Sequence, residues 1–284
     1  MGRSAGETTG PVGRSLVLAL GSSSELEASP GQALQNELVN ATATSAIAES
    51  ALSVIDRTSE EDLLTQLGLL VRDMAYGTGA NWRTLSSRAD IDWSRIDDAV
   101  TVMRNCESAG WWWTQTPHDE QRLVSPVRNG DKDRYAADSA RDVWWSEPIL
   151  AGLARTCGVT PTRGVPVHSL CRDDHNDDGT YAASRSAGST GALVIGDKNG
   201  WLDLVAQYPR VIASTDRPEW SRWFGWPGDW VQPDWARVAL DWACITVTIG
   251  ACVDFSYSAS VVGEHRSVLA GWNPGETVWF QAGA

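Results

Sequence analysis

Apolar positions at helical spacing dominate the first 110 residues. Ser29-Pro30 favours a helix start, because Ser can cap a helix and Pro fits its first turn. One long helix is therefore predicted over residues 29–58, with these apolar residues on one face: Leu34, Leu38, Ala41, Ala48, Leu52 and Ile55. Residues 1–28 are rich in Gly, Ser, Thr and Glu with one short apolar run, so we expect a mobile tail there.

Three shorter helices are expected before residue 110. Thr58 and Glu61 form a capping box, and the helix that they open carries a Leu, Val and Met face and ends at Gly77. A second helix is predicted over residues 81–89. A third is predicted over residues 93–108, with three apolar residues buried: Ile96, Val100 and Met103.

The pattern changes after a polar, Gly-containing stretch at 129–140, which we interpret as a linker. The residues that follow, 141–284, mix short strands with short helices. Strands are predicted at 191–195, 210–213 and 245–257, helices at 201–206 and from Pro233, and a hairpin over 267–280 closed by the type II turn Asn273-Pro274-Gly275-Glu276. The predicted fold class is α+β, with a helical first part and a Trp-rich mixed second part.

The helical part resembles a known family in the order of its apolar residues. Leu85 and Ala89 stand on the second helix, and the third helix leads into Ala109-Gly110-Trp111. This order is similar to the winged helix-turn-helix pattern over about residues 60–128, and we assign the module to residues 59–128. The resemblance implies a third helix that reads DNA and a β-hairpin wing with strands at 111–114 and 122–124 and a tip at 117–120.

The charge of the chain argues against nucleic acid as its main partner. The formal net charge is −13, and only two of the 23 basic residues are Lys. Residues 60–125 hold six Arg against eleven acidic residues, a surface that repels phosphate backbones. We therefore expect a protein partner or self-association. A DNA-binding regulator is an alternative, and its contacts would come from Arg88, Ser94, Arg95 and Arg122.

Tryptophan gathers in the second part of the chain, which holds most of the 16 Trp. Sugars and bases stack on indole rings, and nearby carboxylates can hydrogen-bond hydroxyl groups. The competing interpretation is a small core in which the rings shield one another. The candidate ligand site comprises Trp220, Trp223, Trp226, Trp230, Arg222 and Asp229.

Three further motifs contain Trp: Val143-Trp144-Trp145-Ser146, Pro233-Asp234-Trp235 and Ala270-Gly271-Trp272-Asn273-Pro274. They resemble motifs of uncharacterised Trp-rich actinobacterial proteins. The likeness indicates a host lineage and implies no chemistry.

The sequence indicates neither a metal nor a cofactor. His168, Cys171 and His175 have the spacing of zinc ligands but lack a fourth ligand. Residues 174–179 match half of a calcium loop, but Arg185 replaces the bidentate Glu at its end. Five widely spaced Cys indicate reduced thiols in a cytoplasmic protein. No segment approaches the roughly 20 apolar residues that span a membrane, so no membrane partner is expected.

These observations favour a non-enzymatic binding or regulatory protein. Its first module would contact a macromolecule, and its second would hold a partner or a small ligand. The alternative is an enzyme that acts on a sugar- or nucleotide-like substrate within residues 141–284, with acid/base work by Glu147, Asp216, Glu219 or Asp229. An enzyme predicts that titratable groups converge in the second part, whereas a binding module predicts an open Trp patch without them.

Overall fold

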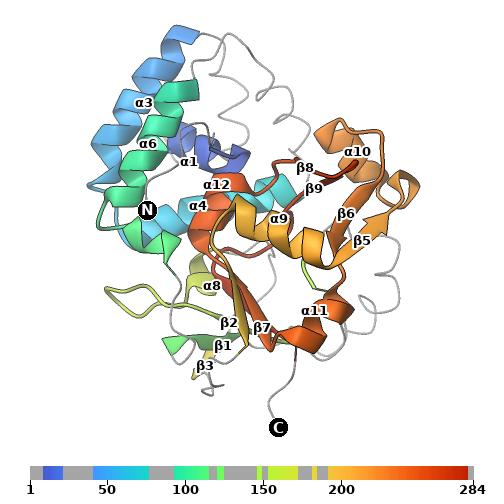
Figure 1. Ribbon diagram of the computed structural model, residues 1–284. Coiled ribbons are helices and arrows are strands. Elements are labelled where there is room, and N and C mark those ends of the chain that lie inside the picture. Colours follow the sequence, from blue (N-terminus) through green and yellow to red (C-terminus); the bar gives the residue numbers. More distant parts are fainter. Residues whose placement is uncertain are drawn as a thin grey trace.

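The fold is α+β, as the sequence predicts, with helices first and a sheet-rich part after them (Figure 1). The computed structural model describes residues 9–21, 41–76, 93–114, 120–124, 146–148, 153–171, 181–183 and 191–280. Within these ranges no helix is both long enough and apolar enough to cross a membrane.

The N-terminal helices gather on one side of the molecule (Figure 1). They are α1 (Pro11–Gly21), α3 (Ala41–Ile55), α4 (Glu60–Tyr76), α6 (Trp93–Asn105) and the 3-10 helix η1 (Gly110–Trp113). The predicted third helix and the helix after residue 58 are confirmed as α6 and α4. The cap of α4 is Ser59 and not Thr58, because the Ser59 hydroxyl accepts the Asp62 N–H at 3.1 Å. The predicted second helix, 81–89, lies outside the described residues.

Helix α1 corrects the expectation of a mobile tail over residues 1–28. Leu16, Val17 and Leu18 are fully buried, and α1 packs against α3, α4, α6 and α12 (Ile249–Phe255). A helix that is buried on several sides lacks the one-sided apolar stripe by which surface helices are predicted. Its end approaches α3 so closely that a Cβ atom at Gly21 would collide with the carbonyl oxygen of Ile47.

The larger sheet has six strands in the order β3-β1-β2-β10-β7-β4. Its strands are β1 (Arg122–Val124), β2 (Ala154–Cys157), β3 (Tyr181–Ala183), β4 (Ala192–Ile195), β7 (Cys244–Val247) and β10 (Glu276–Trp279). All neighbours are antiparallel except β4 and β7, which are parallel. The sheet therefore combines strands that lie far apart in sequence, between residues 122 and 279.

The smaller sheet has four strands in the order β5-β6-β9-β8, and short helices surround both sheets. Its strands are β5 (Pro209–Ile212), β6 (Trp230–Pro233), β8 (Ser260–Val262) and β9 (His265–Ser267). The helices are α8 (Val167–Leu170), α9 (Lys198–Gln207), η3 (Ser214–Asp216), α10 (Pro218–Phe224) and α11 (Trp235–Asp241). The predicted strands at 191–195 and 210–213 and the predicted helix at 201–206 are confirmed by β4, β5 and α9.

Several expected pairings are wrong. Residues 111–113 form part of η1 and not a wing strand, while the expected return strand, β1, pairs with β2 and β3. The predicted β region beyond Val247 is helix α12, capped by the Thr248 hydroxyl. The predicted hairpin over 267–280 does not form, because β9 and β10 belong to different sheets. The turn before β10 is confirmed: Gly275 has a φ of 74° and the Glu276 N–H donates to the Asn273 carbonyl.

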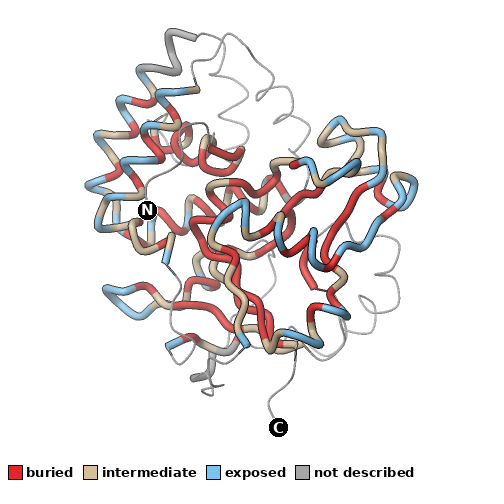
Figure 2. The backbone as a smooth tube through the Cα atoms, viewed as in Figure 1, coloured by how far each residue is buried: buried red, intermediate tan, exposed pale blue. Residues whose placement is uncertain are grey.

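Two hydrophobic cores hold the fold together. The first combines N-terminal residues such as Leu63 and Trp112 with C-terminal residues such as Trp220 and Val253. The second packs α9, α11 and α12 onto the larger sheet, around Ile245. Figure 2 shows the resulting buried centre beneath exposed outer faces of α3 and α6. The helical and Trp-rich parts therefore share a core; the predicted linker, 129–140, lies outside the described residues.

Candidate functional site

The predicted Trp site divides into buried and partly exposed rings. Trp220 and Trp230 are fully buried and pack edge to face with their ring centroids 5.4 Å apart, and Phe224 packs on Trp230. Trp223 and Trp226 are half-buried, whereas Arg222 and Asp229 are exposed. Two of the four predicted rings therefore act as core, which is what the competing interpretation expected.

Trp226 is the predicted ring that lies nearest to a surface role, but protein groups already contact it. The Arg266 guanidinium lies 4.7 Å from its ring centroid, and the Trp226 N–H donates to the Asp229 carbonyl at 3.2 Å. A Cβ atom on Gly228 would collide with the ring, so the backbone also lies against it. A sugar that stacks there would have to displace Arg266. Ligand binding at this cluster stays a prediction.

The predicted nucleic-acid contacts lie on different elements. Ser94 and Arg95 are exposed on α6, Arg122 is half-buried on β1 in the larger sheet, and Arg88 lies outside the described residues. The structure therefore does not place Arg122 on a wing beside α6. Among the predicted carboxylates, Asp216 is exposed and Glu219 half-buried at the start of α10, while Glu147 lies in a cluster of charges.

Metal ligation finds no support in the described part of the chain, where no group of three His, Cys, Asp or Glu is placed to hold an ion. His168 and Cys171 are both buried at α8, and His175 and residues 174–179 lie outside the described ranges. Burial raises the pKa of Cys157, Cys244 and Cys252, the first and last to about 12, so these thiols are poor nucleophiles.

The sheet and its neighbours bring together four ionisable side chains, which we call the charge cluster: Glu147, Arg155, His168 and Glu276. Arg155 Nη1 donates to Glu147 Oε2 at 2.7 Å and also to Glu276 Oε1. His168 Nε2 lies 3.6 Å from Glu276 Oε2. Glu276 is fully buried, whereas 29% of the Arg155 side chain is exposed. One guanidinium nitrogen therefore joins two carboxylates, and the cluster reaches solvent through Arg155.

The strand register explains how the cluster forms. Cys157 lies opposite Glu276, and Arg155 lies opposite Val278, so Arg155 and Glu276 are diagonal neighbours on one face of the sheet. Glu147 comes from a separate segment, which is held in place because the Ser146 N–H donates to the Ala270 carbonyl and the Ala270 N–H donates to the Ser146 hydroxyl. Residues far apart in sequence therefore meet at β2.

The two carboxyl groups have pKa shifts in opposite directions. Burial raises the pKa of Glu147, and the charge of Arg155 opposes this only in part. Burial acts on Glu276 in the same sense, but Arg155, His168 and a 2.6 Å hydrogen bond from Asn273 outweigh it and lower the pKa of Glu276 to about 2. Burial alone would lower the pKa of Arg155, but the two carboxylates raise it, so Arg155 stays charged.

The Nε and Nη2 atoms of Arg155 are the part of the cluster best suited to binding a ligand. These two atoms have no hydrogen-bond partner recorded in the described structure, although Nη1 has two. N–H groups along one guanidinium edge can pair with a carboxylate or phosphate through two parallel hydrogen bonds. Arg122 lies opposite Cys157 on the same face, which places its Cα about 7–8 Å from that of Arg155. Two arginines thus stand on one face of the sheet.

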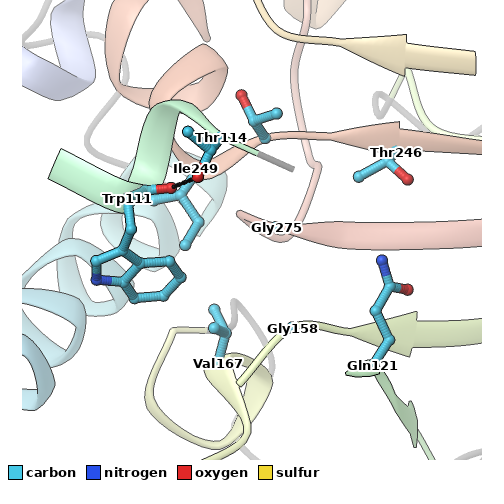
Figure 3. A pocket seen from close by; sticks show the side chains of 9 residues that line it. Trp111, Thr114, Gln121, Gly158, Val167, Thr246, Ile249 and Gly275 are labelled. Atoms are coloured by element: carbon cyan, nitrogen blue, oxygen red, sulfur yellow. Dashed lines mark hydrogen bonds between the residues drawn. The ribbon is translucent and has the colours of Figure 1, made fainter. Parts of the chain in front are cut away.

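A small hollow lies between η1 and the end of the larger sheet (Figure 3). It is partly open to solvent and is lined by Trp111, Thr114, Gln121, Gly158, Val167, Thr246, Thr248, Ile249 and Gly275. Figure 3 shows η1 with Trp111 and Thr114 on one side and the strands that carry Thr246 and Gln121 on the other. Gly158, Val167 and Gly275 directly neighbour Cys157, His168 and Glu276 in the sequence. The hollow is therefore lined by residues next in sequence to the cluster, while the strand residue Thr246 that lines it lies on the opposite face of the sheet from Arg155 and Glu276.

Sequence reasoning selected Glu147 and Arg122 but missed Arg155 and Glu276. Glu276 looked like a turn residue because it completes Asn273-Pro274-Gly275-Glu276. The pairing of β2 with β10 brings it to Arg155, and no local pattern encodes that pairing. The sequence held one signal for a buried charge: Glu276 directly precedes the strand residues Thr277-Val278-Trp279.

Comparison of the chain with protein-family models, with curated proteins and with solved structures found no match.

Proposed function

We propose that this chain is a binding protein for a small anion that carries a carboxylate or phosphate group, with Arg155 as the principal ligand-binding residue. The observation that carries the proposal is the asymmetric state of Arg155. Two carboxylates hold Nη1 inside, while Nε and Nη2 have no recorded partner and part of the side chain is exposed. A guanidinium fixed in this way is organised in advance for a two-point contact with an anion.

Arg122 supports the proposal through charge. When both glutamates are ionised, their two negative charges outnumber the single charge of Arg155, which disfavours an anion. Arg122 lies on the same face, diagonally across from Arg155, and balances that charge. Its side chain has no recorded hydrogen bond in the described structure, and the residue is half-buried. We assign it as the second anion-binding residue.

The experiment is a calorimetric titration of the full chain with sulfate, inorganic phosphate and succinate. Arg155→Lys keeps a positive charge but loses the two-point edge, so affinity should fall about tenfold or more, the equivalent of one strong hydrogen bond. Arg122→Gln should weaken binding severalfold without touching the ion pairs. Arg210→Lys, an exposed arginine on the other sheet, is the matched control and should change nothing. A folded protein that binds none of the three anions overturns the proposal.

Acid/base catalysis is a second candidate, favoured by the opposite pKa shifts of Glu147 and Glu276. Carboxyl groups whose environments separate their pKa values are typical of acid/base pairs. Hydrolysis of p-nitrophenyl esters and phosphates between about pH 5 and 8 tests it. Turnover that is lost in Glu147→Gln and kept in Glu264→Gln, an exposed control, would favour the enzyme. Equal turnover in both variants would exclude Glu147 as its acid or base.

A further inference from the structure

The charge balance of the cluster has a consequence for any anion at Arg155. Glu147 and Glu276 both contact Arg155 Nη1, so their nearest oxygens lie within about 6 Å of each other, the sum of two hydrogen-bond lengths. An anion on the outer edge of the same guanidinium would add further negative charge within a few ångströms of both. Like charges that close disfavour full ionisation of all the groups.

We infer that anion binding at Arg155 is coupled to the uptake of one proton by the Glu147 carboxyl, so that the site releases its ligand as the pH rises. This inference rests on the proposed function, because it needs an anion at Arg155. Glu147 would then regulate the site without contacting the ligand.

The surroundings of the two carboxylates identify Glu147 as the group that takes the proton. Glu276 accepts from Asn273 at 2.6 Å and from Arg155, and His168 lies 3.6 Å away, so three groups favour its ionised form. In the described structure Glu147 has Arg155 as its recorded hydrogen-bond partner, and it is buried. An anion that draws on the charge of Arg155 removes most of what keeps Glu147 ionised.

The pKa directions agree with this geometry. Burial already raises the pKa of Glu147, whereas the partners of Glu276 bring its pKa to about 2. The charged and titratable groups that act on Glu147 within the described residues are Arg155, Glu276 and His168. His168 is the other titratable group beside the two carboxylates, since it faces Glu276 from α8. The experiment must therefore show whether proton uptake depends on Glu147 or on His168.

The test is calorimetric titration of the full chain with sulfate, which keeps its charge between about pH 5.5 and 7.5. Measurement in several buffers of different ionisation enthalpy gives the number of protons taken up. We expect about one proton per sulfate, and an affinity that falls up to tenfold per pH unit once the linked group is ionised in the free protein. Glu147→Gln should bind sulfate without proton uptake and with little dependence on pH.

Two controls make the outcome decisive. The Glu264→Gln variant, changed at an exposed glutamate, should bind sulfate as the wild type does. The His168→Asn variant should still take up about one proton per sulfate. Sulfate binding without proton uptake in the wild type, or uptake that persists in Glu147→Gln, overturns the inference and leaves the anion site standing. Failure of sulfate, phosphate and succinate to bind at all overturns the proposed function, and the inference falls with it.

Discussion

The two glutamates of the charge cluster make opposite predictions for stability. Glu276→Gln removes a carboxylate whose ionised form is stabilised by Arg155, His168 and Asn273. Glu147→Gln removes a carboxyl group whose ionised form is disfavoured by burial. Both substitutions keep the shape of the side chain and both affect the same guanidinium. We therefore expect Glu276→Gln to destabilise the fold much more than Glu147→Gln at neutral pH.

The size of the effect follows from the pKa of Glu276. The change from 4.5 to about 2 corresponds to roughly 3 kcal/mol of folding free energy at about 1.4 kcal/mol per unit. Because the folded-state pKa is lowered, this contribution is complete above about pH 4.5 and is lost as the pH falls toward 2. Glu147 shows the reverse dependence: its raised pKa makes its ionisation unfavourable to folding as the pH rises. Its replacement by Gln should therefore cost less stability near pH 7 than the replacement of Glu276.

Urea unfolding at pH 7 and at several values down to about pH 3 measures these terms. Glu276→Gln should lose about 3 kcal/mol at pH 7, equivalent to a fall in Tm of about 6–12 °C, and the gap to the wild type should narrow in acid. In the Glu276→Gln variant Arg155 still pairs with Glu147, which reduces the loss of stability. Glu276→Gln should nevertheless remain the less stable of the two variants. Equal losses in both variants, or a smaller loss for Glu276→Gln, would refute the assignment of the ionised carboxylate to Glu276.

Three further predictions concern packing. Trp230→Ala should lower the free energy of unfolding in urea by about 3–5 kcal/mol because Trp230 is fully buried. Trp226→Ala, at a half-buried ring, should lower it by less than half as much. Similar losses in both variants would contradict the division of the Trp cluster into buried and partly exposed rings. Gly21→Ala should lower Tm by several degrees because its Cβ meets the Ile47 backbone, while Gly196→Ala, which has open space, should have little effect. Ellman's reagent should label at most Cys106 in the native protein and all five thiols after unfolding, since the other four are buried.

Local sequence signals predicted the elements whose apolar residues repeat on one side. Helices α4 and α6 and strands β4 and β5 lie close to their expected positions, and the turn at Gly275 forms as its residue types require. Helix α1 was missed because its apolar residues surround it, and α12 was missed because Ile245, Val247 and Ile249 continue a strand-like alternation into the helix. Burial on several sides removes the periodicity from which elements are predicted.

Pairing across long sequence distances could not be predicted in the same way. The expected hairpin is absent because β10 pairs with two other strands. One is β2, more than one hundred residues earlier, and the other is β7, about thirty residues earlier. Arg155 and Glu276 become neighbours only through that pairing, so neither looked like a site residue. Glu147 was selected from its residue type alone, and the structure places it at Arg155 rather than at the Trp cluster.

The convergence of these charges bears on the choice between a binding site and a purely structural cluster. A buried ion pair is often no more stabilising than apolar residues of similar volume, so stability alone is a weak reason to place two carboxylates around one arginine. Here the pair is also asymmetric: Glu276 is fully buried and held by three groups, whereas 29% of the Arg155 side chain is exposed and its Nε and Nη2 have no recorded partner in the described structure. A purely structural ion pair has no need of that edge. The Trp rings, in contrast, pack on one another as a core would. The chemistry of this chain is therefore to be sought first at Arg155.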